Sequence, residues 1–168
     1  MTPSDIERIL NSPKDPMECL AVPKLPDGAQ WLYEIKLDGY RFIAVKSSGK
    51  LNLLSRRRNS FNRQYSLVVE ALADLPDDTV IDGEVVALNQ SGRPDFNLLQ
   101  HYRAEASRIH YFVFDLLVYK DRDLTRLSLV ERREIMKSVL NPNPSLRNIA
   151  RDLRESRIRA CFARPRLV

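Results

Sequence analysis

Residues 31–46 read WLYEIKLDGYRFIAVK, and this stretch decides the fold class. Residues 31–36 and 41–46 are both rich in aromatic and β-branched side chains, which favours β-strands. Asp38-Gly39 lies between them. Asp-Gly between two such runs is typical of a tight hairpin, because glycine adopts positive φ without steric cost. The stretch therefore predicts an antiparallel hairpin.

Strand-like segments continue toward the C-terminus and are separated by turn residues. They are residues 51–55, 79–81, 84–88 and 110–119. Ser48-Gly49 and Asp82-Gly83 are the turn signals between neighbouring segments. The last segment is an almost continuous apolar run, which indicates a strand buried on both faces.

Helices are expected at fewer places. Residues 65–75 carry apolar side chains near a 3.6-residue period, and residues 96–101 have the length of one or two turns. Ser128 with Glu131 has the pattern of a capping box that opens a helix ending at Leu140. Short strands joined by tight turns outnumber these helices, so the sequence predicts an α+β fold with mainly antiparallel sheets and flanking helices.

Length and composition are those of one domain with a hydrophobic core, since 43% of the 168 residues are hydrophobic and 29% are charged. No run approaches the roughly 20 apolar residues that cross a membrane, and acids stand near the N-terminus where a signal peptide carries basic residues. Cys19 and Cys161 are too few and too far apart for a disulfide framework or a zinc site. We therefore expect a cytoplasmic protein with no membrane partner.

The net charge of +5 is confined to one segment. Residues 147–168 hold seven arginines against two acids, so residues 1–146 carry no net charge. A basic isoelectric point ordinarily indicates a polyanionic partner, but here it describes only this short tail. An amphipathic helix over residues 146–158 is favoured for the tail, and a contact to the DNA backbone is the alternative.

Lys36 is the first candidate for chemistry. It ends the predicted strand 31–36, which fixes its stem and places its amine at the rim of the sheet, near Asp38 and Arg41. A neighbouring cation, from Arg41 or a bound metal, disfavours the ammonium form and increases the nucleophilic free amine. From spacing alone, an ordinary Asp-Gly hairpin beside a solvated lysine is the more frequent explanation.

The residues around Lys36 also match a known motif. Lys36-Leu37-Asp38-Gly39-Tyr40-Arg41 has the KxDGxR pattern of the covalent nucleotidyltransferases, which include DNA ligases, RNA ligases and mRNA capping enzymes. Further segments that are similar to the family, in its order, are Leu54-Ser55-Arg56 and residues 80–86, 92–100, 111–117 and 129–133. Residues 16–140 therefore resemble the adenylation domain of ATP-dependent DNA ligases, especially the bacterial end-joining type.

The resemblance implies an incomplete DNA ligase/mRNA capping enzyme nucleotidyltransferase fold, with ATP as the nucleotide. It implies that Lys36 attacks the α-phosphate of ATP, forms lysyl-AMP and releases pyrophosphate. Glu34 would contact the adenine edge, and Phe114 would stack on the adenine face. Arg41 and Arg56 would contact the ribose and phosphates, Arg56 in a geometry suited to bidentate phosphate binding.

The resemblance also implies a metal, Mg²⁺ or Mn²⁺. Glu84 would contact the ribose or help to hold the metal, and Asp38 would be a second carboxylate near it. Structural alternatives stay open for three of these residues. Phe114 is equally explained as a core aromatic, Glu84 as a solvated hairpin residue, and Arg56 as part of an exposed basic turn.

The resemblance divides the chain into a Pro-rich lead-in at 1–26, a partial adenylation domain at 27–140 and an Arg-rich tail at 141–168. The tail lacks the Glu-Gly-hydrophobic-x-Lys and Trp-x-Lys-x-Lys elements that come next in the family. Their lysines contact the α-phosphate, and phosphoryl transfer depends on such electrostatic stabilisation. We therefore expect a chain truncated or frameshifted near residue 141, with reduced or no sealing activity.

Three functions remain open. The favoured one is a ligase-family adenylation domain that acts in DNA repair or recombination on nicked or broken double-stranded DNA of the bacterial nucleoid, with a separate chain as one source of the missing elements. The second is a non-catalytic remnant or basic DNA-binding module, which a salt-dependent DNA affinity residing in residues 147–168 would indicate. The third is a capping-type guanylyltransferase, against which the contexts of residues 33–36 and 114–117 argue.

Overall fold

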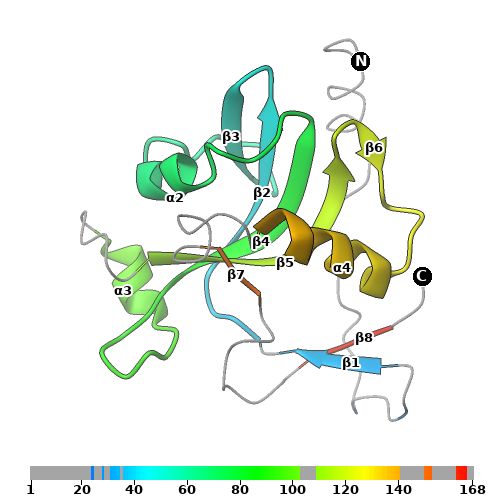
Figure 1. The fold of residues 1–168 in the computed structure, drawn as a ribbon. Coiled ribbons are helices and arrows are strands. Elements are labelled where there is room, and N and C mark those ends of the chain that lie inside the picture. Colours follow the sequence, from blue (N-terminus) through cyan, green and yellow to red (C-terminus); the bar gives the residue numbers. More distant parts are fainter. Residues whose placement is uncertain are drawn as a thin grey trace.

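A computed structural model of the chain describes residues 36–102 and 109–140, the single positions Lys24 and Gly28, and the backbone alone at 31–34, 150–152 and 162–165. A large sheet has the strand order β3-β2-β4-β5-β6, with β7 also beside β5, and β1 pairs with β8 in a small separate sheet (Figure 1). The strands are β1 Trp31–Glu34, β2 Tyr40–Ser47, β3 Lys50–Ser55, β4 Thr79–Ala87, β5 Ile109–Tyr119, β6 Arg122–Asp123, β7 Ala150–Asp152 and β8 Phe162–Pro165.

All described strand pairs are antiparallel except β7 with β5, which is parallel. The α+β class with mainly antiparallel sheets, predicted from the sequence, is therefore confirmed. The turn predicted at Ser48-Gly49 joins β2 to β3, and both residues have positive φ, 49° and 73°. These are the angles that a two-residue hairpin requires.

The described helices are α2 Ser66–Ala71, α3 Phe96–Gln100 and α4 Leu129–Leu140. The predicted capping box at the start of α4 is present. The Ser128 hydroxyl accepts from the Glu131 N–H at 3.3 Å, and the Glu131 carboxylate accepts from the Ser128 N–H at 2.8 Å. Helix α2 is shorter than the predicted 65–75 because its regular turns end at Leu72. None of the described helices is long and apolar enough to cross a membrane.

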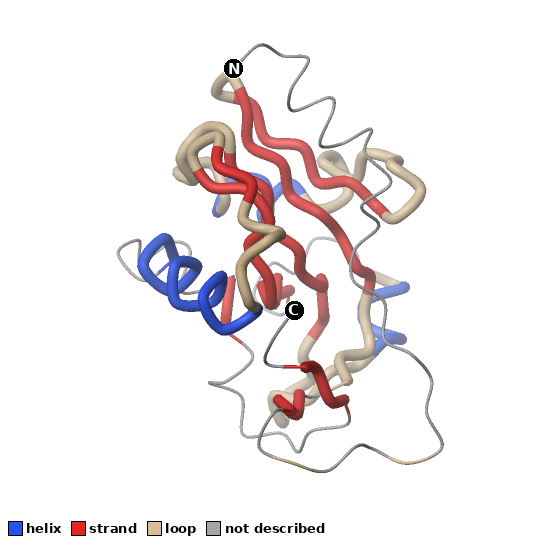
Figure 2. Tube along the Cα trace, turned by 90° about the vertical axis from the view of Figure 1, so that its right-hand side faces the viewer, coloured by secondary structure: helices blue, strands red, loops and turns tan. Residues whose placement is uncertain are grey.

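The three helices pack against the same face of the large sheet. Val68 and Leu72 of the α2 region, Leu99 of α3 and Met136 of α4 belong to one core with side chains of the strands. Figure 2 shows α4, the longest helix, on one side of the strands. We call this the helix face.

Alternate residues of the same strands point to the other face, which we call the second face. It carries two smaller apolar clusters, one of them made of Leu37, Val86, Phe112 and Phe114. Because side chains alternate along a strand, Arg41 of β2 and Glu84 of β4 also belong to the second face.

The hairpin predicted at Asp38-Gly39 is wrong. Strand β1 pairs with β8, while β2 pairs with β3 and β4. Gly39 has a different purpose, because a Cβ on it would stand 2.2 Å from the carbonyl oxygen of Val85. Glycine is needed here for the close approach of two backbones, not for a turn.

The turn predicted at Asp82-Gly83 is also wrong, since both residues lie inside the continuous strand β4. A Cβ on Gly83 would stand 2.6 Å from the Phe112 carbonyl oxygen and 2.7 Å from the Tyr111 ring. The glycine therefore makes room for the Tyr111 ring, whose hydroxyl donates to the Phe42 carbonyl at 2.8 Å.

The C-terminal tail differs from its prediction where it is described. Residues 150–152 form strand β7 beside Tyr111–Val113 of β5, so the favoured helix over 146–158 is wrong at these residues. Backbone pairing with an existing strand outweighs the weak helical pattern of the tail. The sequence also predicts a short helix near residues 6–10, which lie outside the described residues. The three-part division of the chain stays a prediction.

Candidate functional site

Lys36 and Asp38 lie on the connection between β1 and β2, and both side chains are exposed. Leu37 between them is buried and packs on Val86, Phe112 and Phe114 of the second face. This alternation anchors the connection through Leu37 and turns the amine of Lys36 and the carboxylate of Asp38 to solvent. The predicted nucleophile is therefore accessible and adjoins the cluster that contains Phe114.

Glu84 lies on β4 directly opposite Arg41 of β2. Burial raises the pKa of its carboxyl to about 7 from an ordinary 4.5, and the charges of Asp38 and Asp82 raise it further. The Gly39 N–H, which donates to the carboxylate, and the Arg41 charge act in the opposite direction. A nearby positive charge favours the ionised form of such a carboxyl and so lowers its pKa.

Arg41 is held in a bidentate ion pair with Asp82. Its Nε and Nη2 donate to the two carboxylate oxygens at 3.0 and 2.6 Å. The Asp82 side chain is only 2% exposed, whereas that of Arg41 is 27% exposed. The guanidinium carbon also lies 5.1 Å from the centroid of the Phe114 ring, within the range of a cation–π interaction. The ion pair with Asp82 therefore fixes the position of the Arg41 guanidinium, which remains partly exposed at the surface.

Phe114 is 4% exposed and belongs to the second face with Leu37 and Val86. Its contacts agree with the core role and also place its ring directly beside Arg41. Arg56 follows β3 in an exposed turn. Because Ser55 pairs with Phe42, Arg56 lies at the same end of the sheet as Arg41.

The structure thus brings five of the predicted residues to one region, while Arg56 is less closely tied to it. Asp38 and Arg41 interact through charge with Glu84, and Arg41 contacts the Phe114 ring. Lys36 adjoins this group through its chain neighbour Leu37, which packs on Phe114. Arg56 shares only the end of the sheet. The side chain of Glu34 lies outside what the structure describes, and its backbone pairs with Phe162.

Asp82 is the residue that sequence reasoning missed. It was assigned to a turn, yet it is an almost fully buried carboxylate whose role is to hold Arg41. The available signal is an aspartate between the apolar residues 80–81 and 85–87. A buried charge in such a strand requires a partner of opposite charge.

The region also suits a divalent metal that takes only one or two of its ligands from the protein. Among the described residues, no three or more Asp, Glu, His or Cys side chains are grouped so as to hold a metal by themselves. Asp38 and Glu84 are close enough for their charges to interact. Mg²⁺ is commonly bound by one or two carboxylates with substrate phosphates and water as its other ligands, so this pair suits such a metal.

Comparison with known proteins gives the same assignment as the motifs. A family described as "ATP dependent DNA ligase domain" matches residues 11–160. The multifunctional non-homologous end joining protein LigD of Pseudomonas aeruginosa is 35% identical over 136 residues, which are 76% of this chain and 16% of that protein. The SPbeta prophage-derived DNA ligase-like protein LigB of Bacillus subtilis is 31% identical over 120 residues, or 69% of this chain and 43% of that protein.

Solved structures agree. A mycobacterial DNA ligase D complexed with ATP and MES matches with a TM-score of 0.61 and 32% identity, over 67% of this chain and 38% of that one. The ligase domain of Mycobacterium tuberculosis LigD matches with a TM-score of 0.58 and 33% identity. The chain spans less than half the length of each of these relatives. By the extent of the family match and the agreement in fold, the chain belongs to the ATP-dependent DNA ligase family.

Proposed function

We propose that this chain binds ATP on the second face and that Lys36 becomes adenylylated. In this step a bond forms between Lys36 Nζ and the α-phosphorus, the bond from that phosphorus to the pyrophosphate oxygen breaks, and the amine loses a proton. One observation carries the proposal. The exposed Lys36 adjoins the apolar cluster of Phe114, beside the cross-strand pair Arg41 and Glu84.

The surrounding residues supply binding and orientation. Phe114 offers an apolar ring for the base, and Glu34 a carboxylate for its exocyclic amine. Arg41, fixed by Asp82, offers its guanidinium to the ribose or phosphates, and Arg56 is a second phosphate ligand at the same end of the sheet. Preorganised charges of this kind account for most of the catalysis in phosphoryl transfer.

Asp38 and Glu84 would hold a Mg²⁺ or Mn²⁺ ion together with the phosphates of ATP. Such an ion would supply positive charge that offsets the charge of the phosphates. The same charge would favour the ionised form of Glu84, whose carboxyl has a raised pKa. The carboxylate pair and the nucleotide therefore depend on the same ion.

The proposed substrate is nicked or broken double-stranded DNA, and the proposed reaction is the sealing of its breaks. It is supported by the family and by the relatives that are named for non-homologous end joining. The family's two lysine-bearing elements are not found in residues 141–168. We propose that cations supplied from outside these residues, for example by a separate chain, accelerate Lys36 adenylylation.

Incubation with α-labelled ATP and Mg²⁺ or Mn²⁺, followed by denaturing electrophoresis, tests the proposal. We expect label on the wild-type chain and on Lys50→Ala, which removes another exposed lysine, but none on Lys36→Ala. The label is expected to be released by acid and retained in alkali, as a phosphoramidate is. Absence of label on folded wild-type protein contradicts the proposal, and a preference for GTP would indicate the capping-type reaction instead.

A further inference from the structure

Strand β5 carries a β-bulge at Phe114. Asp82 of β4 pairs with Asp115, but the next residue, Gly83, pairs with Val113. Phe114 is therefore the extra residue and has no Cα partner in β4. The bulge also shifts the alternation of side chains, because Val113 and Leu116 both belong to the core of the helix face. Bulges of this kind are frequent beside active sites, where they redirect a side chain.

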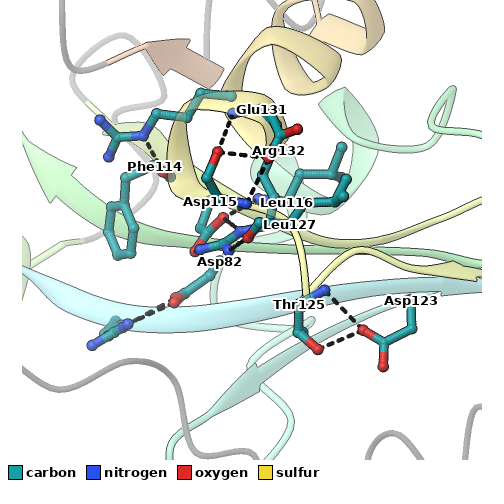
Figure 3. Close-up of polar contacts among 12 residues, drawn as sticks. Asp82, Phe114, Asp115, Leu116, Asp123, Thr125, Leu127, Glu131 and Arg132 are labelled. Atoms are coloured by element: carbon teal, nitrogen blue, oxygen red, sulfur yellow. Dashed lines mark hydrogen bonds and ion pairs between the residues drawn. The ribbon is translucent and has the colours of Figure 1, made fainter. Parts of the chain in front are cut away.

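Two consecutive arginines of α4 hold this bulge from the helix face. Arg133 is 2% exposed, and its Nε donates to the carbonyl oxygen of Phe114 at 3.0 Å. Arg132 donates to both carboxylate oxygens of Asp115, at 2.7 and 2.8 Å, and to the Leu127 carbonyl at 2.6 Å. Figure 3 shows Phe114 and Asp115 next to each other on β5, with Arg132 reaching Asp115.

The helix that carries these arginines is itself fixed. The capping box of Ser128 and Glu131 closes its first turn, and Met136 packs with no exposure in the main core. A hydrogen bond from such a helix to the peptide oxygen of Phe114 therefore restrains the backbone from which the ring projects. The ring lies on the second face, on the opposite side of the sheet from the helix.

We propose that Arg133 is a positioning residue for the nucleotide base. It holds the bulge of β5 in the geometry that presents the Phe114 ring to the base, although it does not itself contact the nucleotide. This inference rests on the proposed function, in which Phe114 stacks on adenine. A guanidinium suits the task because its planar donors are preorganised and it stays charged when buried.

A merely structural role and a positioning role differ in one measurable respect. Loss of a structural contact lowers stability and affects all ligands of the folded protein alike. Loss of a contact that orients the Phe114 ring weakens ATP but spares a ligand that has phosphates and no base. Inorganic tripolyphosphate is such a ligand, so the ratio of its dissociation constant to that of ATP isolates the contribution of the base.

The experiment compares this ratio, in the presence of Mg²⁺, for the full wild-type chain and three variants. Arg133→Met removes the donor but keeps an unbranched side chain, and Phe114→Leu removes the ring. Met136→Ala creates a cavity beside the same helix and removes no hydrogen-bond donor to the bulge. We expect Phe114→Leu and Arg133→Met each to weaken ATP about 3- to 10-fold, the range of an aromatic stacking contact, with tripolyphosphate unchanged. Met136→Ala should lower stability and leave the ratio at its wild-type value.

A second readout follows the ring directly. The guanidinium carbon of Arg41 lies 5.1 Å from the centroid of the Phe114 ring, so we expect the NMR resonance of its Nε–H to carry a ring-current shift. We expect this resonance to move in Arg133→Met and to stay in place in Met136→Ala. An unchanged resonance together with an unchanged binding ratio overturns the inference.

The outcomes separate the inference from the function beneath it. If Phe114→Leu weakens ATP but Arg133→Met does not, only the positioning role is wrong. If Phe114→Leu leaves ATP binding unchanged, the stacking role of Phe114 is wrong and the inference is overturned with it, while the proposed adenylylation of Lys36 still stands. If wild type binds neither ligand, the proposed function is wrong and the inference is overturned as well. Should Arg133→Met fail to fold, Arg133→Lys gives the same comparison, because lysine keeps one donor. We then expect a smaller selective loss of ATP affinity. An unchanged ratio of the two dissociation constants would again contradict the inference.

Discussion

Glu84→Gln is expected to make the metal-free protein more stable at neutral and alkaline pH. The pKa of Glu84 is about 7 in the folded chain against an ordinary value of 4.5. Because the folded value is the higher one, the folded chain binds this proton more tightly than the unfolded chain does. Its contribution to stability is complete below pH 4.5 and is lost as pH rises through 7. The glutamine side chain is uncharged at every pH, so the variant does not lose this contribution.

The magnitude follows from the same two values. A pKa difference of this size corresponds to about 3 kcal/mol in the free energy of unfolding. The side chain is only half-buried, so solvent screening reduces the expected gain to about 1–3 kcal/mol at pH 8. Glutamine still has an oxygen that accepts from the Gly39 N–H, so the hydrogen bond to the connection between β1 and β2 is retained.

Urea unfolding followed by circular dichroism, in EDTA and at several pH values from 4.5 to 8.5, measures the effect. Glu70→Gln, which removes the charge of an exposed carboxylate on α2, is the matched control. The difference between Glu84→Gln and wild type should be near zero at the acid end and grow as pH rises. A difference that is flat across this range, or a variant that is less stable at pH 8, would refute the assigned burial of Glu84.

Two further substitutions test packing near the site. Asp115→Asn leaves the 7% exposed Arg132 side chain without its carboxylate and should lower the free energy of unfolding by about 3–5 kcal/mol; a loss below 1 kcal/mol in denaturant melts would contradict the buried ion pair. Gly39→Ala places a Cβ 2.2 Å from the Val85 carbonyl oxygen and should cost about 2 kcal/mol or more. Gly49→Ala, whose only obstacle is its φ of 73°, is the control, with a loss of about 1–2 kcal/mol, and equal losses in the two glycine variants would count against the close approach.

Local patterns in the sequence were sufficient wherever the determining contacts are themselves local. Ser48-Gly49 forms its hairpin because positive φ is a property of those two residues and their neighbours. The capping box of Ser128 and Glu131 spans four residues and forms as the pattern predicts. The KxDGxR motif at Lys36–Arg41, together with the further segments that follow it in the family's order, predicted the family, which the comparisons confirm.

Tertiary structure decided where a residue serves a distant segment. Gly39 resembles a turn glycine, but its size is required by Val85, 46 positions later in the chain. Strand β1 finds its partner in β8, far along the sequence, which no local period reveals. Short-range signals cannot distinguish a glycine that turns the chain from one that lets another backbone approach. Both positions require a residue without a Cβ.

The sequence by itself determined the family, the α+β class and the positions of Lys36 and Phe114 as candidates. Only the tertiary structure decided that Asp82 holds Arg41 and that Arg133 reaches the carbonyl of Phe114. The physical reason is that a buried charge takes its partner from whichever element folding brings within hydrogen-bond distance. That proximity depends on strand register, and here the register depends on the bulge at Phe114, which no residue type in the sequence predicts.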